Sequence, residues 1–72
     1  MENDDFENLT NREREVLQLI AEGKTSRQIT VLLHISEKTV RTHRAHIMEK
    51  LDTHSIAELT RYAIRKGMIG SD

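Results

Sequence analysis

The feature that most limits the fold of this 72-residue chain is a series of four helix-start signals in a sequence without proline. A Ser or Thr side chain caps a helix by accepting a hydrogen bond from a backbone N–H of the first turn, and a Glu or Gln three positions later can return the bond. Three of the four signals have this complete capping-box spacing. The expected N-cap residues are Thr10, Thr25, Ser36 and Ser55, and Glu13, Gln28 and Glu58 complete the three boxes.

Apolar periodicity extends each signal into a helix of limited length. After Thr10, apolar residues recur on one helical face until Gly23, which suits a left-handed C-terminal position. A short second helix follows Thr25, and we expect His34 at the turn after it, because His tolerates left-handed φ better than most residues. The third helix is predicted from Glu37 to about Leu51, and the fourth from Ser55 to about Lys66, before Gly67. The fold class is therefore all-α, with a domain over residues 9–69, a disordered tail over 1–8 and a short tail over 70–72.

The second and third predicted helices are separated by a tight turn, which is the sequence form of a helix-turn-helix. A helix of about eight residues is unstable alone in water, so the second helix must be held by its neighbours. The same pattern also fits an αα-hairpin in a small bundle that contacts only proteins. The distribution of charge bears on this alternative.

Charge is unevenly distributed along a chain whose formal net charge is −1. Residues 1–22 hold seven acids and two bases, residues 23–50 hold six bases and two acids, and residues 51–72 hold three of each. A pI of about 6.4 is low for a nucleic-acid-binding domain, since such domains often exceed about 9. Exposed charges are screened beyond about 8 Å at physiological salt, so a local basic stripe matters more than the total.

The third helix concentrates this positive charge on its outer face. With Val40 at the centre of the buried side, helical geometry places bases first and small side chains next on the opposite side. The major groove of B-DNA is about 12 Å wide and admits one α-helix, so small residues allow close approach to the bases. Arg is the commonest reader of guanine, and a Thr or Ala methyl can meet a thymine methyl. The outer face consists of Lys38, Arg41, Thr42, Ala45, His46 and Glu49.

A family resemblance covers nearly the whole chain, from about Leu9 to Ile69. The residues that carry it are Leu9-Thr10-x-Arg12-Glu13-x-Glu15-Val16-Leu17, Gly23, Gln28-Ile29, Leu33, Ile35-Ser36-x-Lys38-Thr39-Val40-Arg41-x-His43, Ile47 and Lys50-Leu51. Together they resemble the LuxR-type helix-turn-helix. The ending, Ala57-Glu58-Leu59-x-x-Tyr62-Ala63-Ile64 with Gly67 and Ile69, is similar to the output domains of NarL/FixJ-type two-component response regulators.

The resemblance implies a DNA-binding transcriptional regulator, either the output domain of a response regulator or a small stand-alone protein. Its partners would be double-stranded DNA with paired half-sites and a second copy in a weak dimer, with RNA polymerase a further candidate. The family's base-facing positions fall on Arg41, Thr42 and Ala45, and its dimerisation helix carries Leu59, Tyr62 and Ala63. The full set of expected DNA contacts is Thr25, Arg27, Lys38, Thr39, Arg41, Thr42, Arg44, Ala45, His46 and Lys50.

Some positions depart from the usual family pattern. Thr30 stands where a small Ala is common, and Asp52 and Thr53 replace a frequent Gly or Asn followed by an apolar residue. Arg44 lies where relatives often have Val or Ile, so its stem is expected to cover apolar surface while its head reaches a phosphate. Ala45 is short where some relatives carry a long base, which limits its expected base contact to a methyl.

The sequence gives no support to catalysis or to a cofactor. There is no Cys, and we find no nucleophile–base pair, no Gly-rich phosphate loop and no paired acids. His43 and His46 have a chelating spacing but no third ligand, so no metal site is expected. The acidic start and the lack of an apolar run of ~18 residues predict a cytoplasmic protein without a membrane partner. The alternative function is a helical protein–protein interaction module that uses the fourth helix and does not bind DNA.

Overall fold

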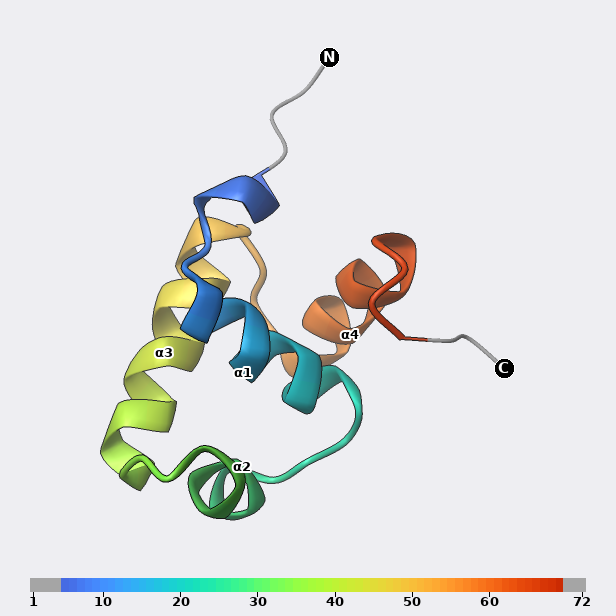
Figure 1. Cartoon of the computed structure of the whole chain (residues 1–72). Coiled ribbons are helices and arrows are strands. Elements are labelled where there is room, and N and C mark those ends of the chain that lie inside the picture. The colour runs from blue at the N-terminus through green and yellow to red at the C-terminus, as the bar shows by residue number, and fades with distance from the viewer. Residues whose placement is uncertain (1–4, 70–72) are drawn as a thin grey trace.

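The computed structural model describes residues 5–69, and every regular element in that range is helical. Figure 1 shows α1 in the middle of the molecule, with α3 on one side, α4 on the other and α2 crossing below. α1 packs against both α3 and α4, while α2 packs mainly against α3. The elements are a 3-10 helix η1 (Asp5–Asn8), α1 (Asn11–Ala21), α2 (Ser26–Leu33), α3 (Glu37–Lys50) and α4 (Ile56–Arg65). This confirms the all-α, four-helix fold class.

The first two capping boxes form as predicted. The Thr10 hydroxyl accepts a hydrogen bond from the Glu13 backbone N–H at 3.0 Å, and the Glu13 carboxylate accepts one from the Thr10 N–H at 2.9 Å. The same pair of bonds joins Thr25 and Gln28, at 3.1 and 2.8 Å. Both helices therefore begin within one residue of the position that their capping residues predict.

The predicted third box is wrong in one of its two bonds. Ser55 caps α4 by accepting from the Glu58 N–H at 3.2 Å. The Glu58 carboxylate, however, accepts from the N–H of His54 at 2.7 Å instead of returning to Ser55. The side chain thus stabilises the backbone one residue earlier, in the connection between α3 and α4. Ser36 caps α3 as expected, through the Thr39 N–H at 3.0 Å.

Two non-glycine residues adopt the left-handed conformation at the ends of helices. His34 has φ 59° and ψ 43° and ends α2, which confirms its predicted place in the turn. Asp52 has φ 54° in the connection after α3. The left-handed region disfavours most side chains but accepts Gly and Asn readily. Asp is one of the few other side chains that adopt it, because its short polar group can bond locally to the backbone.

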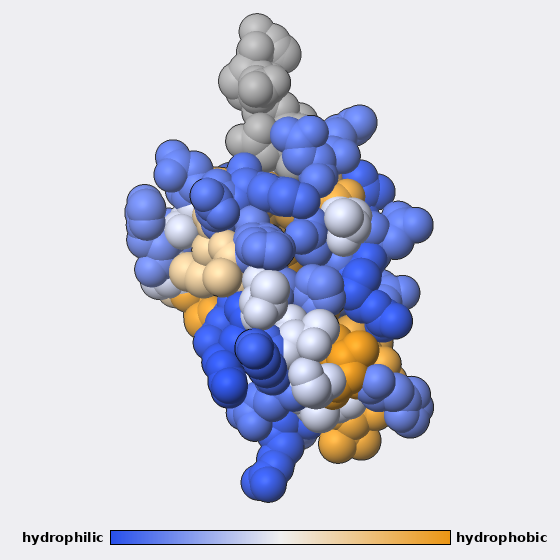
Figure 2. Space-filling view, turned by 90° about the vertical axis from the view of Figure 1, so that its left-hand side faces the viewer, coloured by the Kyte–Doolittle hydropathy of each residue, from blue (hydrophilic) through white to orange (hydrophobic). Residues whose placement is uncertain are grey.

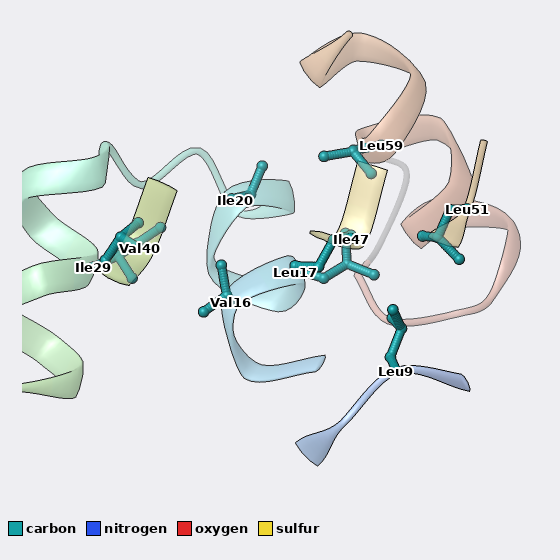
Figure 3. Packing of buried hydrophobic residues seen from close by; sticks show 9 residues of the cluster. All are labelled: Leu9, Val16, Leu17, Ile20, Ile29, Val40, Ile47, Leu51 and Leu59. Atoms are coloured by element: carbon teal, nitrogen blue, oxygen red, sulfur yellow. The ribbon is translucent and has the colours of Figure 1, made fainter. Parts of the chain in front are cut away.

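The core lies around α1 and receives side chains from every α-helix. In Figure 3, Ile29 lies beside Val40 at one end, and Leu17 and Ile47 meet in the middle. Burial of these aliphatic side chains is the main stabilising term available to so small a domain. The cluster consists of Leu9, Val16, Leu17, Ile20, Ile29, Val40, Ile47, Leu51 and Leu59.

The core also takes two residues that were expected to form a dimer surface. Leu59 and Ala63 are both fully buried within one copy of the chain. They lie on the side of α4 that packs against α1. Neither side chain has surface left to contact a second copy in this conformation, so their dimer role stays a prediction without structural support. Tyr62, the third expected dimer residue, is partly buried and packs against the core.

The expected disordered tail over 1–8 is also corrected in part. Asp5–Asn8 form η1, and the ring of Phe6 stacks on that of Tyr62 with 6.4 Å between centroids. The Arg14 guanidinium lies 4.5 Å from the centre of the Phe6 ring. η1 therefore joins the folded domain by covering one edge of α4. Residues 1–4 and the predicted tail over 70–72 lie outside the described residues.

None of the α-helices between residues 5 and 69 is both long and apolar enough to cross a membrane.

Candidate nucleic-acid interface

α3 is held so that one side is buried and the other faces solvent. Ser36 fixes its start, and Val40 and Ile47 point into the core, where both are almost completely buried. Those two residues are two helical turns apart, so they fix the rotation of the helix about its own axis. The side chains opposite them must then face outward.

The outward face of α3 has the composition that the sequence predicts. Lys38, Arg41, Thr42 and Ala45 are all exposed, with the bases nearer the start of the helix. Figure 2 views the molecule from the side on which α3 lies in Figure 1, and shows a mainly hydrophilic surface with a pale, weakly polar area among the charged residues. A helix with this profile can approach a polyanion closely, because short side chains stand where the approach is tightest.

Arg41 forms an ion pair on this face. Its guanidinium lies 3.6 Å from the carboxylate of Glu37 one turn earlier, and both side chains are more than half exposed. Exposed pairs of this kind contribute only about 0.3–0.5 kcal/mol, so Arg41 can leave its partner at little cost. Lys38 has no ion-pair or hydrogen-bond partner in the described part of the chain. Two long bases are therefore available for contact with an anionic ligand.

The start of α2 lies close to α3 beside a small pocket. Thr25 and Arg44 both line this pocket, so the structure brings together two expected DNA-contact residues that are far apart in sequence. Arg44 is half-buried, and Val40 and Ile29 line the same pocket, which agrees with an apolar role for its stem. Arg27 is exposed on the first turn of α2.

Lys50 takes a different role from the expected phosphate contact. Its ammonium donates to the carboxylate of Glu13 at 2.8 Å and to the backbone carbonyl of Asn8 at 3.1 Å. Glu13 is buried, although it carries a charge. A buried carboxylate needs a charged or hydrogen-bonding partner, and Lys50 supplies it. This ion pair fastens the end of α3 to the start of α1.

His46 shares the same carboxylate. Its Nδ1 lies 3.8 Å from the second oxygen of Glu13, and its side chain is about half exposed. His46 therefore sits at the border between the outward face of α3 and the contact with α1. His43 is partly buried, and its buried Nδ1 has no hydrogen-bond partner among the described residues. No group of three or more metal-ligating side chains lies together in that part of the chain.

The surroundings of Glu13 change the pKa of its carboxyl. Burial raises the pKa, but hydrogen bonds from Lys50 and from the Thr10 N–H, with the positive charges of Lys50 and His46, lower it further than burial raises it. The pKa of Glu13 in the folded protein therefore lies below its ordinary value. A lowered carboxyl pKa stabilises the fold at neutral pH, because the unfolded chain binds the proton more tightly.

We expect the resulting stability to be lost in acid. It is fully present above the ordinary Glu pKa of about 4.3 and disappears as pH falls through the lower pKa of the folded state. Glu13→Gln should reduce the free energy of unfolding at pH 7, and its difference from the wild type should shrink as pH falls below about 4. Urea unfolding measured at a series of pH values tests this. A difference that stays constant from pH 7 to pH 2 would contradict the assignment.

Sequence reasoning missed three residues that shape this surface. Glu13 was recognised only as part of a capping box, Glu37 was not connected with Arg41, and Lys24 was not considered. For Glu13 a signal was present, because it occupies a position of the inward stripe of α1 between Leu9 and Val16. An acidic residue at such a position predicts a basic partner on a neighbouring helix.

The structure thus combines a capped α2, a left-handed turn at His34 and an α3 with a basic outer face. The family model described as "Bacterial regulatory proteins, luxR family" matches residues 7–63, which is most of the chain. The protein belongs to the LuxR family. The observed helix-turn-helix agrees with this family, whose domain binds DNA in regulatory proteins and is not an enzyme.

Curated relatives of the LuxR-family domain are named as regulatory proteins. The LuxR-family domain is 58% identical over 60 residues to the uncharacterised response regulatory protein YgeK of Escherichia coli K12. The alignment covers 83% of this chain and 41% of that protein. It is 46% identical over 67 residues to the oxygen regulatory protein NreC of Staphylococcus haemolyticus, covering 93% of this chain and 31% of that protein. NreC of Staphylococcus carnosus is 45% identical over the same length. The LuxR-family domain thus spans less than half the length of these relatives.

Proposed function

We propose that the domain binds double-stranded DNA by inserting α3 into the major groove and that it regulates transcription in this way. The observation that carries the proposal is the outward face of α3, where Lys38 and Arg41 precede the small residues Thr42 and Ala45, all exposed. A protein-contact helix would gain nothing from this order of long bases and short side chains. In the major groove, the short side chains allow α3 to approach the base edges closely, and the two basic side chains can reach guanine or a phosphate.

The proposed contacts divide into base readers and backbone anchors. Arg41, Thr42 and Ala45 face the bases. The anchors contact phosphates and so fix the position of α3 along the groove. They include Thr25 and Arg27 at the start of α2, where the Thr25 N–H already donates to the Gln28 side chain of the capping box. We leave Lys50 out of the anchors, because two of its three N–H donors already bind Glu13 and the Asn8 carbonyl. The proposed anchors are Thr25, Arg27, Lys38, Thr39, Arg44 and His46.

Selection of bound sites from random duplex DNA is the experiment that tests this function. We expect a defined sequence to be enriched, and we expect its affinity to fall with salt at a log–log slope of about −0.9 for each phosphate contacted. A matched single-stranded DNA serves as the control for charge alone. Failure to enrich any sequence, together with a flat response to salt between about 50 and 200 mM, would favour the protein-interaction alternative.

Dimerisation on DNA would use a different part of α4 from the one the sequence indicated. With Leu59 and Ala63 in the core, the apolar side chains left on one flank are Ile56, which is 43% exposed, and the half-buried Ile64. This flank is small, and a small interface holds weakly in solution. Two adjacent half-sites would raise the effective concentration of the second copy, so that even a weak contact between the copies would increase the affinity for DNA.

We expect Ile56→Glu to abolish the gain in affinity that two half-sites give over one; this gain is compared within the variant, because Ile56 also lines the pocket of Thr25 and Arg44, and the new charge should weaken binding to each half-site alike. A buried glutamate at the interface would carry a desolvation cost that the weak contact cannot offset. Titration of both DNAs measures the effect. Arg65→Glu is the control, because residue 65 is also exposed on α4 and lies on the face of the helix opposite Ile56. Equal cooperativity in the wild type and in both variants would remove α4 from the proposal.

The relatives' names extend the proposal to the whole protein. We infer that the domain acts as the DNA-binding output of a response regulator, since YgeK is named a response regulatory protein and aligns over most of this chain. RNA polymerase is then a candidate partner at the promoter. With DNA as the proposed ligand, we also propose a cytoplasmic location.

A further inference from the structure

α2 turns two aliphatic side chains to solvent. Val31 is 67% exposed and Leu32 52%, the highest values among the large exposed hydrophobic residues of the described chain. Helical geometry places Val31 on the side of α2 away from the buried Ile29, and Leu32, three positions after Ile29, at the edge of the buried side. Figure 2 shows orange at the lower edge of the molecule, the end at which α2 lies in Figure 1. Scattered exposed aliphatic residues are common, but a pair that shares a groove with unpaired charge calls for a specific account.

The two side chains line one shallow groove with two cations. This groove has a volume of about 460 Å³ and is lined by Val31 and Leu32 together with Gln28, Arg27 and Lys24. None of these five side chains is acidic. Within residues 5–69, the ammonium of Lys24 and the guanidinium of Arg27 have no ion-pair or hydrogen-bond partner. The groove therefore offers apolar surface and uncompensated positive charge side by side.

The combination of apolar surface and positive charge distinguishes between three possible occupants of the groove. DNA could pair with Arg27 and Lys24 through phosphates, but phosphates offer nothing apolar to Val31 and Leu32. A second copy that used the same face would bring like charges together, because a two-fold interface pairs each patch with itself. A protein segment with both carboxylates and aliphatic side chains matches the whole surface. An amphipathic helix supplies both kinds of side chain on neighbouring positions of one face.

We propose that the outer face of α2 docks an acidic amphipathic helix of another protein. Aliphatic side chains of that helix cover Val31 and Leu32, and its carboxylates pair with Lys24 and Arg27. The groove contains none of the outward residues of α3, but it shares Arg27 with the proposed phosphate anchors. Docking there adds a protein partner to a domain whose proposed function concerns DNA alone.

A designed peptide tests the proposal without knowledge of the natural partner. The probe is a synthetic helical peptide with Leu at positions i, i+3, i+4 and i+7, titrated into the isotope-labelled full chain and followed by NMR. Its Glu residues flank the Leu stripe and Ala fills the far side, so that repulsion between carboxylates does not unfold the helix, and we expect saturable shifts centred on residues 24–32. The double variant Val31→Ser/Leu32→Ser should weaken binding by about tenfold or more, as expected for loss of central apolar contacts. Ile56→Ser is the matched control, an exposed aliphatic residue on another helix.

Three results would overturn the proposal. The first is equal binding of a peptide whose Leu residues are replaced by Ser, which would reduce the contact to charge. The second is shifts centred on α3 that persist in the double variant. The third is concentration-dependent association of the protein alone that the double variant abolishes, which would identify a second copy as the occupant. Binding of the double variant to the selected DNA should stay unchanged, so failure here is distinguishable from failure of the proposed DNA function.

Discussion

Leu59→Ala is expected to lower the free energy of unfolding by about 2–5 kcal/mol, because the cavity left in a packed core adds to the lost transfer free energy. Leu59 has no exposed surface, and it joins α4 to the cluster that α1 and α3 form. Domains of this size have a stability of roughly 0.05–0.15 kcal/mol per residue. The variant would therefore lose a large part of its total stability, and urea unfolding followed by circular dichroism would show it.

Ile56→Ala is the control for this prediction. It removes a similar side chain from the same helix at a position that is 43% exposed, so we expect a loss below about 1 kcal/mol. If Leu59→Ala instead kept the wild-type unfolding midpoint and affected only cooperative DNA binding, Leu59 would belong to an interface between copies. The two variants thus separate a core role from a dimer role on one helix.

Arg41→Ala is expected to cost about 1–3 kcal/mol on the preferred DNA site and to relax the preference at one base pair. Binding to random DNA should weaken much less, because a base reader adds little to sequence-independent attraction. Fluorescence anisotropy with the selected duplex, with single-base variants of it and with random DNA measures all three affinities at one fixed salt concentration.

Glu37→Gln provides the matched comparison for Arg41. It removes the carboxylate that pairs with Arg41 and takes a negative charge away from the DNA-facing side. We expect this variant to keep the sequence preference and to bind every DNA somewhat more tightly. Should Arg41→Ala weaken specific and random DNA by the same factor, Arg41 would be a phosphate contact and the base-reading assignment would fall.

The helix pattern could be predicted from the sequence because its causes are local. Caps, stops and apolar spacing involve residues within four positions of one another, and the two complete capping boxes and the turn at His34 follow from them. The outward face of α3 follows for the same reason, since Val40 and Ile47 fix its rotation. Membership of the LuxR family added the DNA partner but no further geometry.

Apart from the local bond of Glu58 to the His54 N–H, the errors concern contacts between segments that are distant in the sequence. An apolar α4 has several aliphatic flanks, and its periodicity alone does not tell which flank a neighbouring helix covers. Tyr62 is covered partly by Phe6, from a segment without any periodicity of its own. Lys50 looked like a surface base because its partner, Glu13, is 37 positions away. Such pairs become visible only when the helices have been packed together.

The attachment of η1 changes where the cooperative folding unit begins. Phe6 covers an edge of α4, and the Asn8 carbonyl accepts from the Lys50 ammonium at the end of α3. These few residues before α1 therefore touch the two helices that are farthest from them in sequence. Shortening the chain to its four α-helices would remove an aromatic partner and an acceptor at once. We therefore expect the smallest form that folds independently to start at the 3-10 turn ahead of α1, and not at the first capping residue.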